Sequence, residues 1–183
     1  MLGSIHSSRQ RLLRLVQNYL RFAELESIRH DEERKHFLLS EHFAFPDAVL
    51  KDTVTYVGTQ AGRMKDIVLR ADAAAVQMGV RNFEKIIEEL TDNACKFSLD
   101  GTRIEITGQK LNGYYELKVM DRGRGMAQQQ IQSVGAYQQF DRMQHEQRGV
   151  GLGLAIVHAI IDLHGGTLRV ESEAGKYTAV TVL

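Results

Sequence analysis

Residues 82–120 read NFEKIIEELTDNACKFSLDGTRIEITGQKLNGYYELKVM, and this stretch decides the fold class. In its first half, apolar residues recur three and four positions apart, which predicts a helix over 82–97. These residues are Phe83, Ile86, Ile87, Leu90 and Ala94. In its second half, two alternating runs, 102–109 and 114–120, flank a turn at Leu111-Asn112-Gly113, which predicts a β-hairpin. A helix followed by a hairpin does not fit the strict strand–helix alternation of a Rossmann fold.

The flanking segments extend this mixed pattern. Pro46 and Asp47 predict the start of a helix that ends near residue 61, and a second apolar helix covers about 152–163. Further strands are expected at 66–72, 167–172 and 177–183. Helices mixed with hairpin-joined strands predict an α+β fold, a two-layer sandwich with helices on one face of a mixed sheet.

The first 30 residues form a separate unit. No proline or glycine interrupts 4–29, and apolar residues follow a helical stripe with steps of seven. The stripe comprises Ile5, Leu12, Leu15, Val16, Tyr19, Phe22 and Ala23. A lone helix cannot bury such a stripe, so we expect self-association with partner helices ahead of simple packing on its own domain. Polar residues 30–36 indicate a boundary, giving a helical unit at 1–32 and a compact domain at 37–183.

Composition excludes several classes of protein. The 23 basic and 23 acidic residues cancel, which argues against nucleic acid or an anionic membrane as the main partner. One cysteine, Cys95, rules out an intrachain disulfide and fits a reducing, cytoplasmic compartment. No apolar run approaches the roughly 20 residues of a membrane helix.

Three polar residues share one face of the predicted helix at 82–97. Glu89 and Asn93 are four apart, and Asn93 and Lys96 are three apart. An amide oxygen can bind Mg²⁺ and an ammonium can bind phosphate, so this face could hold a divalent ion together with a phosphate. Taken alone, a solvated face with an ordinary ion pair is the better interpretation.

Two glycine motifs follow. Asp121 ends a predicted strand before Gly123 and Gly125, where its carboxylate could accept a hydrogen bond from an exocyclic amine such as that of adenine; a plain turn is the alternative. Gly149, Gly151 and Gly153 open the last helix, where exposed N–H groups and the helix dipole favour a phosphate. The polar segment between them, 128–147, is expected to act as a lid over the nucleotide.

In combination, these motifs resemble the nucleotide-binding boxes of histidine kinases. Residues 89–97 resemble the asparagine box, 121–125 the first glycine box, 137–140 the aromatic box of the lid, and 149–154 the second glycine box. The resemblance covers about 37–183 and extends to the ATPase superfamily shared with gyrase and the Hsp90 chaperones, with its Bergerat-type ATP-binding fold. Upstream, 8–26 resembles the second helix of the family's dimerisation and phosphotransfer hairpin.

This resemblance implies ATP and Mg²⁺ as ligands and assigns roles to residues. Asn93 would bind Mg²⁺ with help from Glu89, Lys96 would contact phosphate, and Asp121 would bind the adenine amine. The other nucleotide contacts would be Gly123, Gly125, Phe140, Arg142, Arg148, Gly149, Gly151, Leu152 and Gly153. Implied partners are the phosphoacceptor histidine of the hairpin, the receiver domain of a response regulator, and a second copy of the chain in a homodimer.

The chain departs from the family pattern at two points. Glu89 stands where many histidine kinases carry asparagine, and a glutamate there activates water in ATP-hydrolysing relatives. The family's histidine box is absent: the nearest approach, at 30–34, lacks its proline and follows the helix. We therefore expect little autophosphorylation, and a first hairpin helix upstream. The alternatives are an ATPase or anti-sigma-factor-like serine kinase of the superfamily, and a non-catalytic nucleotide-binding module.

Overall fold

The computed structural model describes residues 2–135 and 152–183. Its helices are α1 (Leu2–Arg29), α2 (Glu32–Ser40), α3 (Pro46–Gln60), the short 3-10 helix η1 (Met64–Asp66), α4 (Val80–Phe97), α5 (Gln128–Gly135) and α7 (Leu152–Leu163). Its strands are β1 (Ile67–Ala71), β2 (Ile104–Leu111), β3 (Tyr114–Asp121), β4 (Leu168–Glu173) and β5 (Tyr177–Val182). Among these helices, none is both long and apolar enough to cross a bilayer.

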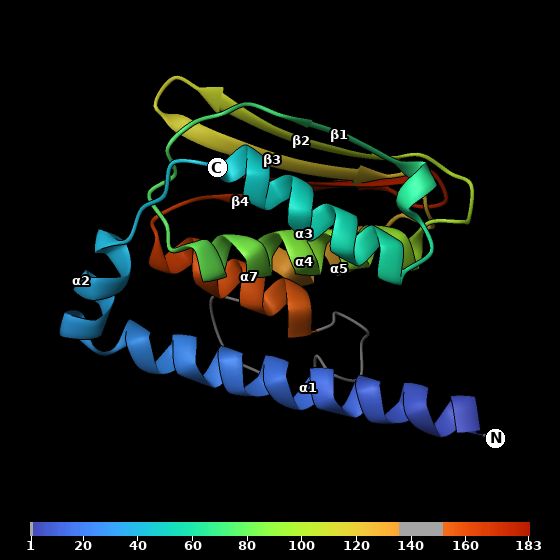
Figure 1. Ribbon diagram of the computed structural model, residues 1–183, viewed down its shortest axis with the longest axis horizontal. Helices are drawn as coiled ribbons and strands as arrows, with labels where there is room; N and C mark the ends of the chain where they lie inside the picture. Colours follow the sequence, from blue (N-terminus) through green and yellow to red (C-terminus); the bar gives the residue numbers. More distant parts are fainter. Residues whose placement is uncertain (1, 136–151) are drawn as a thin grey trace.

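The strands form one mixed sheet in the order β1-β2-β3-β5-β4. β1 runs parallel to β2, whereas the other neighbouring pairs are antiparallel. α3, α4 and α7 cover one face of this sheet, and α1 lies outside them (Figure 1). The predicted fold class, an α+β sandwich of a mixed sheet with helices on one face, is confirmed.

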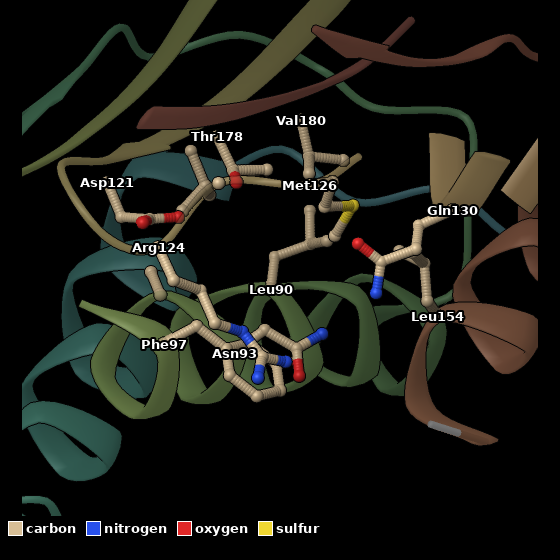
Figure 2. Close-up of a pocket in the computed structure, with 13 residues that line it drawn as sticks. Leu90, Asn93, Phe97, Asp121, Arg124, Met126, Gln130, Leu154, Thr178 and Val180 are labelled. Atoms are coloured by element: carbon tan, nitrogen blue, oxygen red, sulfur yellow. The ribbon is translucent and has the colours of Figure 1, made fainter. Parts of the chain in front are cut away.

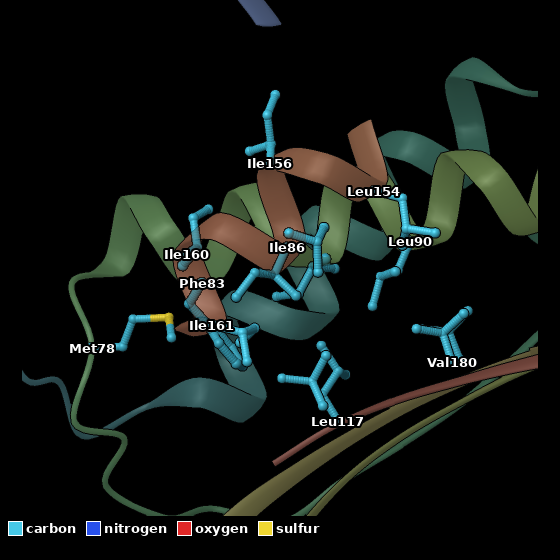
Figure 3. Packing of buried hydrophobic residues seen from close by; sticks show 14 of the residues in the cluster. Met78, Phe83, Ile86, Leu90, Leu117, Leu154, Ile156, Ile160, Ile161 and Val180 are labelled. Carbon is cyan, nitrogen blue, oxygen red and sulfur yellow. The ribbon is translucent and has the colours of Figure 1, made fainter. Parts of the chain in front are cut away.

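The core lies between the sheet and the layer of α4 and α7. Ile86 and Leu90 of α4 point towards Leu117 and Val180 of the sheet (Figure 3), and all four are buried. The α7 residue Ile156 points away from the sheet in the same view, yet it is fully buried. α7 is therefore covered on two sides, which explains why it is apolar around almost its whole circumference.

Helix α1 packs on its own domain and also exposes part of its apolar stripe. Leu25 and Ile28 are buried in the domain core, so the helix packs on its own domain. Arg29 also bonds Asp162 of α7 at 2.7 Å, and Arg21 bonds Asn82 of α4. Between residues 12 and 20, however, α1 exposes large apolar side chains: Leu12, Leu13, Leu15, Val16, Tyr19 and Leu20. Phe22 is partly buried against the core.

One short helix was not predicted from the sequence. α2 occupies Glu32–Ser40, within the polar segment expected to mark a boundary, and the division into two units stays a prediction. The Asp31 side chain accepts a hydrogen bond from the Arg34 N–H at 3.1 Å and so caps the helix. Glu32 and Glu33 in the first turn favour the helix N-terminus electrostatically. Capping, rather than an apolar period, accounts for this short helix.

The remaining expected elements are present, with small shifts at their ends. α4 begins at Val80, two residues before the predicted start, and η1 precedes β1. The hairpin turn places Asn112 and Gly113 at φ values of 29° and 94°, as a two-residue turn between strands requires. Within the expected lid, 128–135 is helical (α5); the rest of the lid lies outside the described residues.

Candidate functional site

A pocket opens between α4 and the adjacent ends of β3 and β5 (Figure 2). The residues that line it are Leu90, Asn93, Ala94, Phe97, Val119, Asp121, Arg124, Gly125, Met126, Gln130, Leu154, Thr178 and Val180. They come from α4, β3, the loop after β3, α5, α7 and β5. An apolar wall with a few converging polar groups is typical of a small-molecule site.

Strand geometry brings Asp121 into this pocket. Side chains alternate along β3, so Leu117, Val119 and Asp121 share the buried face. The first two enter the core, whereas Asp121 lies at the strand end and is only 6% exposed. The buried face of β3 therefore carries two apolar residues followed by a buried carboxylate beside the pocket.

The carboxylate of Asp121 is incompletely satisfied. Its Oδ1 is buried with no hydrogen-bond partner among the described residues. Burial raises its pKa to about 6, against the opposing effects of a hydrogen bond from the Gly123 N–H and of the Arg63 guanidinium. A buried acceptor without a donor costs free energy. A ligand amine that donates to this carboxylate would offset part of the cost, so the group fits the adenine amine.

The two glycines after Asp121 allow close packing of the loop. A Cβ on Gly123 would overlap the Phe97 carbonyl oxygen at the end of α4, and one on Gly125 would overlap the Glu173 carbonyl oxygen. Gly125 also has a φ of +62°, which disfavours other residues. Gly125 lines the pocket, where a ligand could approach its backbone closely. Gly123 allows the loop to pack closely against the end of α4.

A hydroxyl network supports the same end of the sheet. Thr178 pairs with Asp121 in the β3–β5 register. Its Oγ1 lies 3.1 Å from the Ser172 Oγ, which accepts a hydrogen bond from the Met126 N–H at 2.8 Å. The network fixes the loop that carries Met126 relative to the strand that carries Thr178.

The three polar residues predicted on α4 are not in the same surroundings. Asn93 lines the pocket, whereas Glu89 and Lys96 do not. Glu89 is buried. Its Oε1 accepts a hydrogen bond from the Asn18 amide of α1 at 3.0 Å and forms an ion pair with the Lys85 ammonium at 2.6 Å. A Cβ on Gly153 would overlap Glu89 Oε2, so this glycine gives the glutamate its space.

Lys96 lies on the outer side of α4. Its ammonium pairs with Asp92, and Arg14 of α1 bonds the same Asp92 Oδ2 at 2.9 Å. The Lys96 side chain is 52% exposed. A phosphate would have to compete with Asp92 for it.

The second glycine box is described only in part. Leu152 and Gly153 open α7, where Leu152 is half-buried, and Leu154 lines the pocket. The other predicted contacts lie outside the described residues: Phe140, Arg142, Arg148, Gly149 and Gly151. Their roles stay predictions.

Sequence reasoning missed several pocket residues. Arg124 lies between Gly123 and Gly125, and this position in the glycine loop is the only sequence feature that indicated a place near the ligand. Phe97 was quoted in the asparagine box without a role. Thr178 and Met126 depend on strand register and loop path, so no local pattern pointed to them.

Comparison with known proteins identifies the family of this chain. Residues 79–183 match the family described as histidine kinase-, DNA gyrase B-, and HSP90-like ATPase. The chain belongs to this family, and it forms the ATP-binding catalytic part found in histidine kinases. The predicted family is confirmed.

Similar proteins are histidine kinases. The chain is 30% identical over 179 residues to histidine protein kinase DivJ of Caulobacter vibrioides, covering 97% of this chain and 29% of DivJ. It is 29% identical over 182 residues to the sensor-like histidine kinase R01002 of Rhizobium meliloti, covering 97% of this chain and 34% of that protein. The chain therefore spans about a third of these relatives.

A solved structure has the same fold. The histidine kinase AdeS of Acinetobacter baumannii superposes with a TM-score of 0.71 at 22% identity. The match covers 99% of this chain and 81% of the AdeS chain, so it includes α1 as well as the sheet domain.

Proposed function

We propose that this chain binds Mg-ATP and presents the γ-phosphate to a histidine on a dimerisation hairpin. The observation that carries the proposal is the buried, unpartnered Oδ1 of Asp121 in a pocket that Asn93 also lines. Phosphoryl transfer depends on positioning and charge neutralisation more than on covalent help from the protein. A domain that holds the nucleotide at one end suits this task.

The proposed roles follow the pocket from its inner end outward. Asp121 accepts a hydrogen bond from the adenine amine, and the backbone at Gly125 lies close to the base. Asn93 offers a neutral oxygen to Mg²⁺, which also binds phosphate oxygens and water. The start of α7 directs N–H groups towards the phosphates. Phe140, Arg142, Arg148, Gly149 and Gly151 complete the proposed site.

Glu89 has a structural role in this proposal. Its carboxylate is bonded by Asn18 and Lys85 and lies outside the pocket lining. We propose on this basis that Glu89 joins α1 to the domain, and the metal contact and the water activation considered for it stay predictions. Measuring ATP hydrolysis by Glu89→Gln decides the matter, since an unchanged rate excludes water activation and the ATPase alternative that depends on it.

Calorimetric titration with a non-hydrolysable ATP analogue tests the proposal. We expect Mg²⁺-dependent binding by the wild-type chain and at least tenfold weaker binding by Asp121→Asn, because a good charged hydrogen bond contributes on that order. Asp52→Asn, on the exposed face of α3, is the matched control and should bind normally.

The same variants test transfer. With a separately supplied hairpin, γ-labelled ATP should label its histidine, and Asp121→Asn should lower the yield in proportion to its occupancy. Binding by a folded wild-type chain without any transfer would instead favour the non-catalytic module. No binding at all would reject the nucleotide site.

We further infer that α1 pairs with a second copy of the chain. The exposed apolar residues of α1, such as Leu15 and Tyr19, support this inference. Sedimentation velocity should show a dimer for the wild-type chain and a monomer for Leu15→Lys. A wild-type chain that stays monomeric at high concentration would contradict the inference.

The receiver domain of a response regulator is the proposed downstream acceptor of the phosphoryl group. We propose that the chain acts in the cytoplasm, because ATP and receiver domains are found there.

A further inference from the structure

The described part of the pocket lining contains one acidic and one basic side chain. Asp121 is the acid, and Arg124 is the base. Asp121 lies at the sheet side, whereas the Arg124 side chain runs from the glycine loop towards Asn93 and Phe97 on α4 (Figure 2). Positive charge is thus placed away from the carboxylate proposed to bind adenine.

The backbone of Arg124 is held on both sides. Its N–H donates to the Phe97 carbonyl oxygen at 3.0 Å, and its own carbonyl oxygen accepts from the Gly175 N–H at 2.7 Å. These bonds join the loop to the end of α4 and to the turn between β4 and β5. The direction in which the Arg124 side chain leaves the loop is therefore fixed.

The side chain rests on an aromatic ring. The guanidinium carbon lies 4.2 Å from the centre of the Phe97 ring, an arrangement that a cation–π interaction favours. No carboxylate among the described residues forms an ion pair with Arg124. The guanidinium therefore lies over the ring, and its N–H groups can donate to a ligand.

Lys96 presents the opposite case. The resemblance to histidine kinases assigned phosphate binding to this residue, yet its ammonium is paired with Asp92 and does not line the pocket. A nucleoside triphosphate brings several negative charges into the pocket. Among the described cations, Arg124 is the one placed to meet them, and a guanidinium binds phosphate oxygens with two parallel N–H groups.

We propose that Arg124, supported by the Phe97 ring, is a phosphate-binding residue of this site. It binds the phosphates next to the ribose, on the side of the pocket where Asn93 holds the metal. The inference rests on the proposed nucleotide site and adds a residue to it. The proposed contact requires a phosphate, so Arg124 should contribute to the binding of nucleotides but not to the binding of nucleosides.

The test compares ATP, ADP and adenosine on the full 183-residue chain. For Arg124→Ala we expect about 10- to 100-fold weaker binding of ATP and ADP, because bonds to charged groups contribute on that order. Adenosine affinity should change less than about twofold, since it has no phosphate. Arg124→Lys should lose less than Arg124→Ala, because it keeps the charge without the two parallel donors. Arg122→Ala, an exposed neighbour on the same loop, is the matched control.

Three results would overturn the inference. Equal losses for adenosine and ATP would mean that Arg124 contacts the base instead. Unchanged ATP and ADP affinity in Arg124→Ala would mean that it contacts no ligand. A wild-type chain that binds adenosine but gains nothing from phosphates would remove the phosphate site and leave the adenine site intact. Failure of the proposed function is distinct, because it would appear as no binding of any of the three by the wild-type chain.

Discussion

Glu89 and Asp121 are buried to the same extent, with 6% of each residue exposed, but their surroundings differ. Glu89 lies on the side of α4 that faces α1, where an amide and an ammonium bond its Oε1. Asp121 lies on the other side of α4, at the pocket, and its Oδ1 has no partner among the described residues. Burial alone therefore does not distinguish a structural carboxylate from a binding one.

The difference lies in what satisfies the charge. A buried charge is tolerated when it is paired and hydrogen-bonded, and it is costly otherwise. The chain itself supplies the partners of Glu89, so this residue joins α1 to the domain. The chain leaves Asp121 short of a donor, so a ligand can supply one. Two substitutions with opposite expected effects on stability test this distinction.

Glu89→Ala should produce the larger change. It leaves the buried Asn18 amide without its acceptor and the Lys85 ammonium with Glu88 as its remaining partner, so the free energy of unfolding should fall by about 2–3 kcal/mol. Chemical denaturation measures the loss. Faster hydrogen exchange in α1 would show that the contact between α1 and α4 is the part that weakens.

Glu88→Ala is the matched control for this substitution. Glu88 bonds the same Lys85 at 3.2 Å, but its side chain is 35% exposed. Water replaces much of such a pair, so the cost should stay below about 1 kcal/mol. Equal losses for the two glutamates would show that the buried contact with Asn18 contributes little, and the comparison with Asp121 would then lose its basis.

Much of the fold follows from local sequence pattern. The stripe of α4 and the alternation of β2 and β3 each repeat with the period of their element, so helix, hairpin and layer order were predictable. Asp121 was predictable as well, because it continues the alternation of Leu117 and Val119 to the end of a strand. Glycines next to it then indicated a close approach of the chain.

The surroundings of α4 could not be predicted in the same way. Helical spacing places Glu89, Asn93 and Lys96 on one face, but it does not reveal that α1 covers part of that face. The position of α1 depends on tertiary contacts of Asn18 and Arg14, which no periodicity encodes. α2 was missed for a related reason, since its start depends on the Asp31 cap rather than on apolar residues.

Asp121→Asn should produce the smaller change, in the opposite direction. The folded pKa of about 6 lies above the value of roughly 3.9 in an unfolded chain. The native chain therefore binds this proton more readily than the unfolded chain between those values, and stability falls as the pH rises through them. The cost is absent below about pH 4 and complete above about pH 6.

Asparagine carries no charge, so the substitution removes this cost. Without nucleotide, Asp121→Asn should raise the free energy of unfolding by about 1–2 kcal/mol near pH 8 and by almost nothing near pH 4. Denaturant titrations at both pH values measure this, with Asp52→Asn expected to change neither. A gain of equal size at both pH values would trace to packing rather than to the buried charge. A variant that gains stability while it loses ATP would identify a carboxylate kept for its ligand, whereas a loss of stability in Glu89→Ala would identify one kept for the fold.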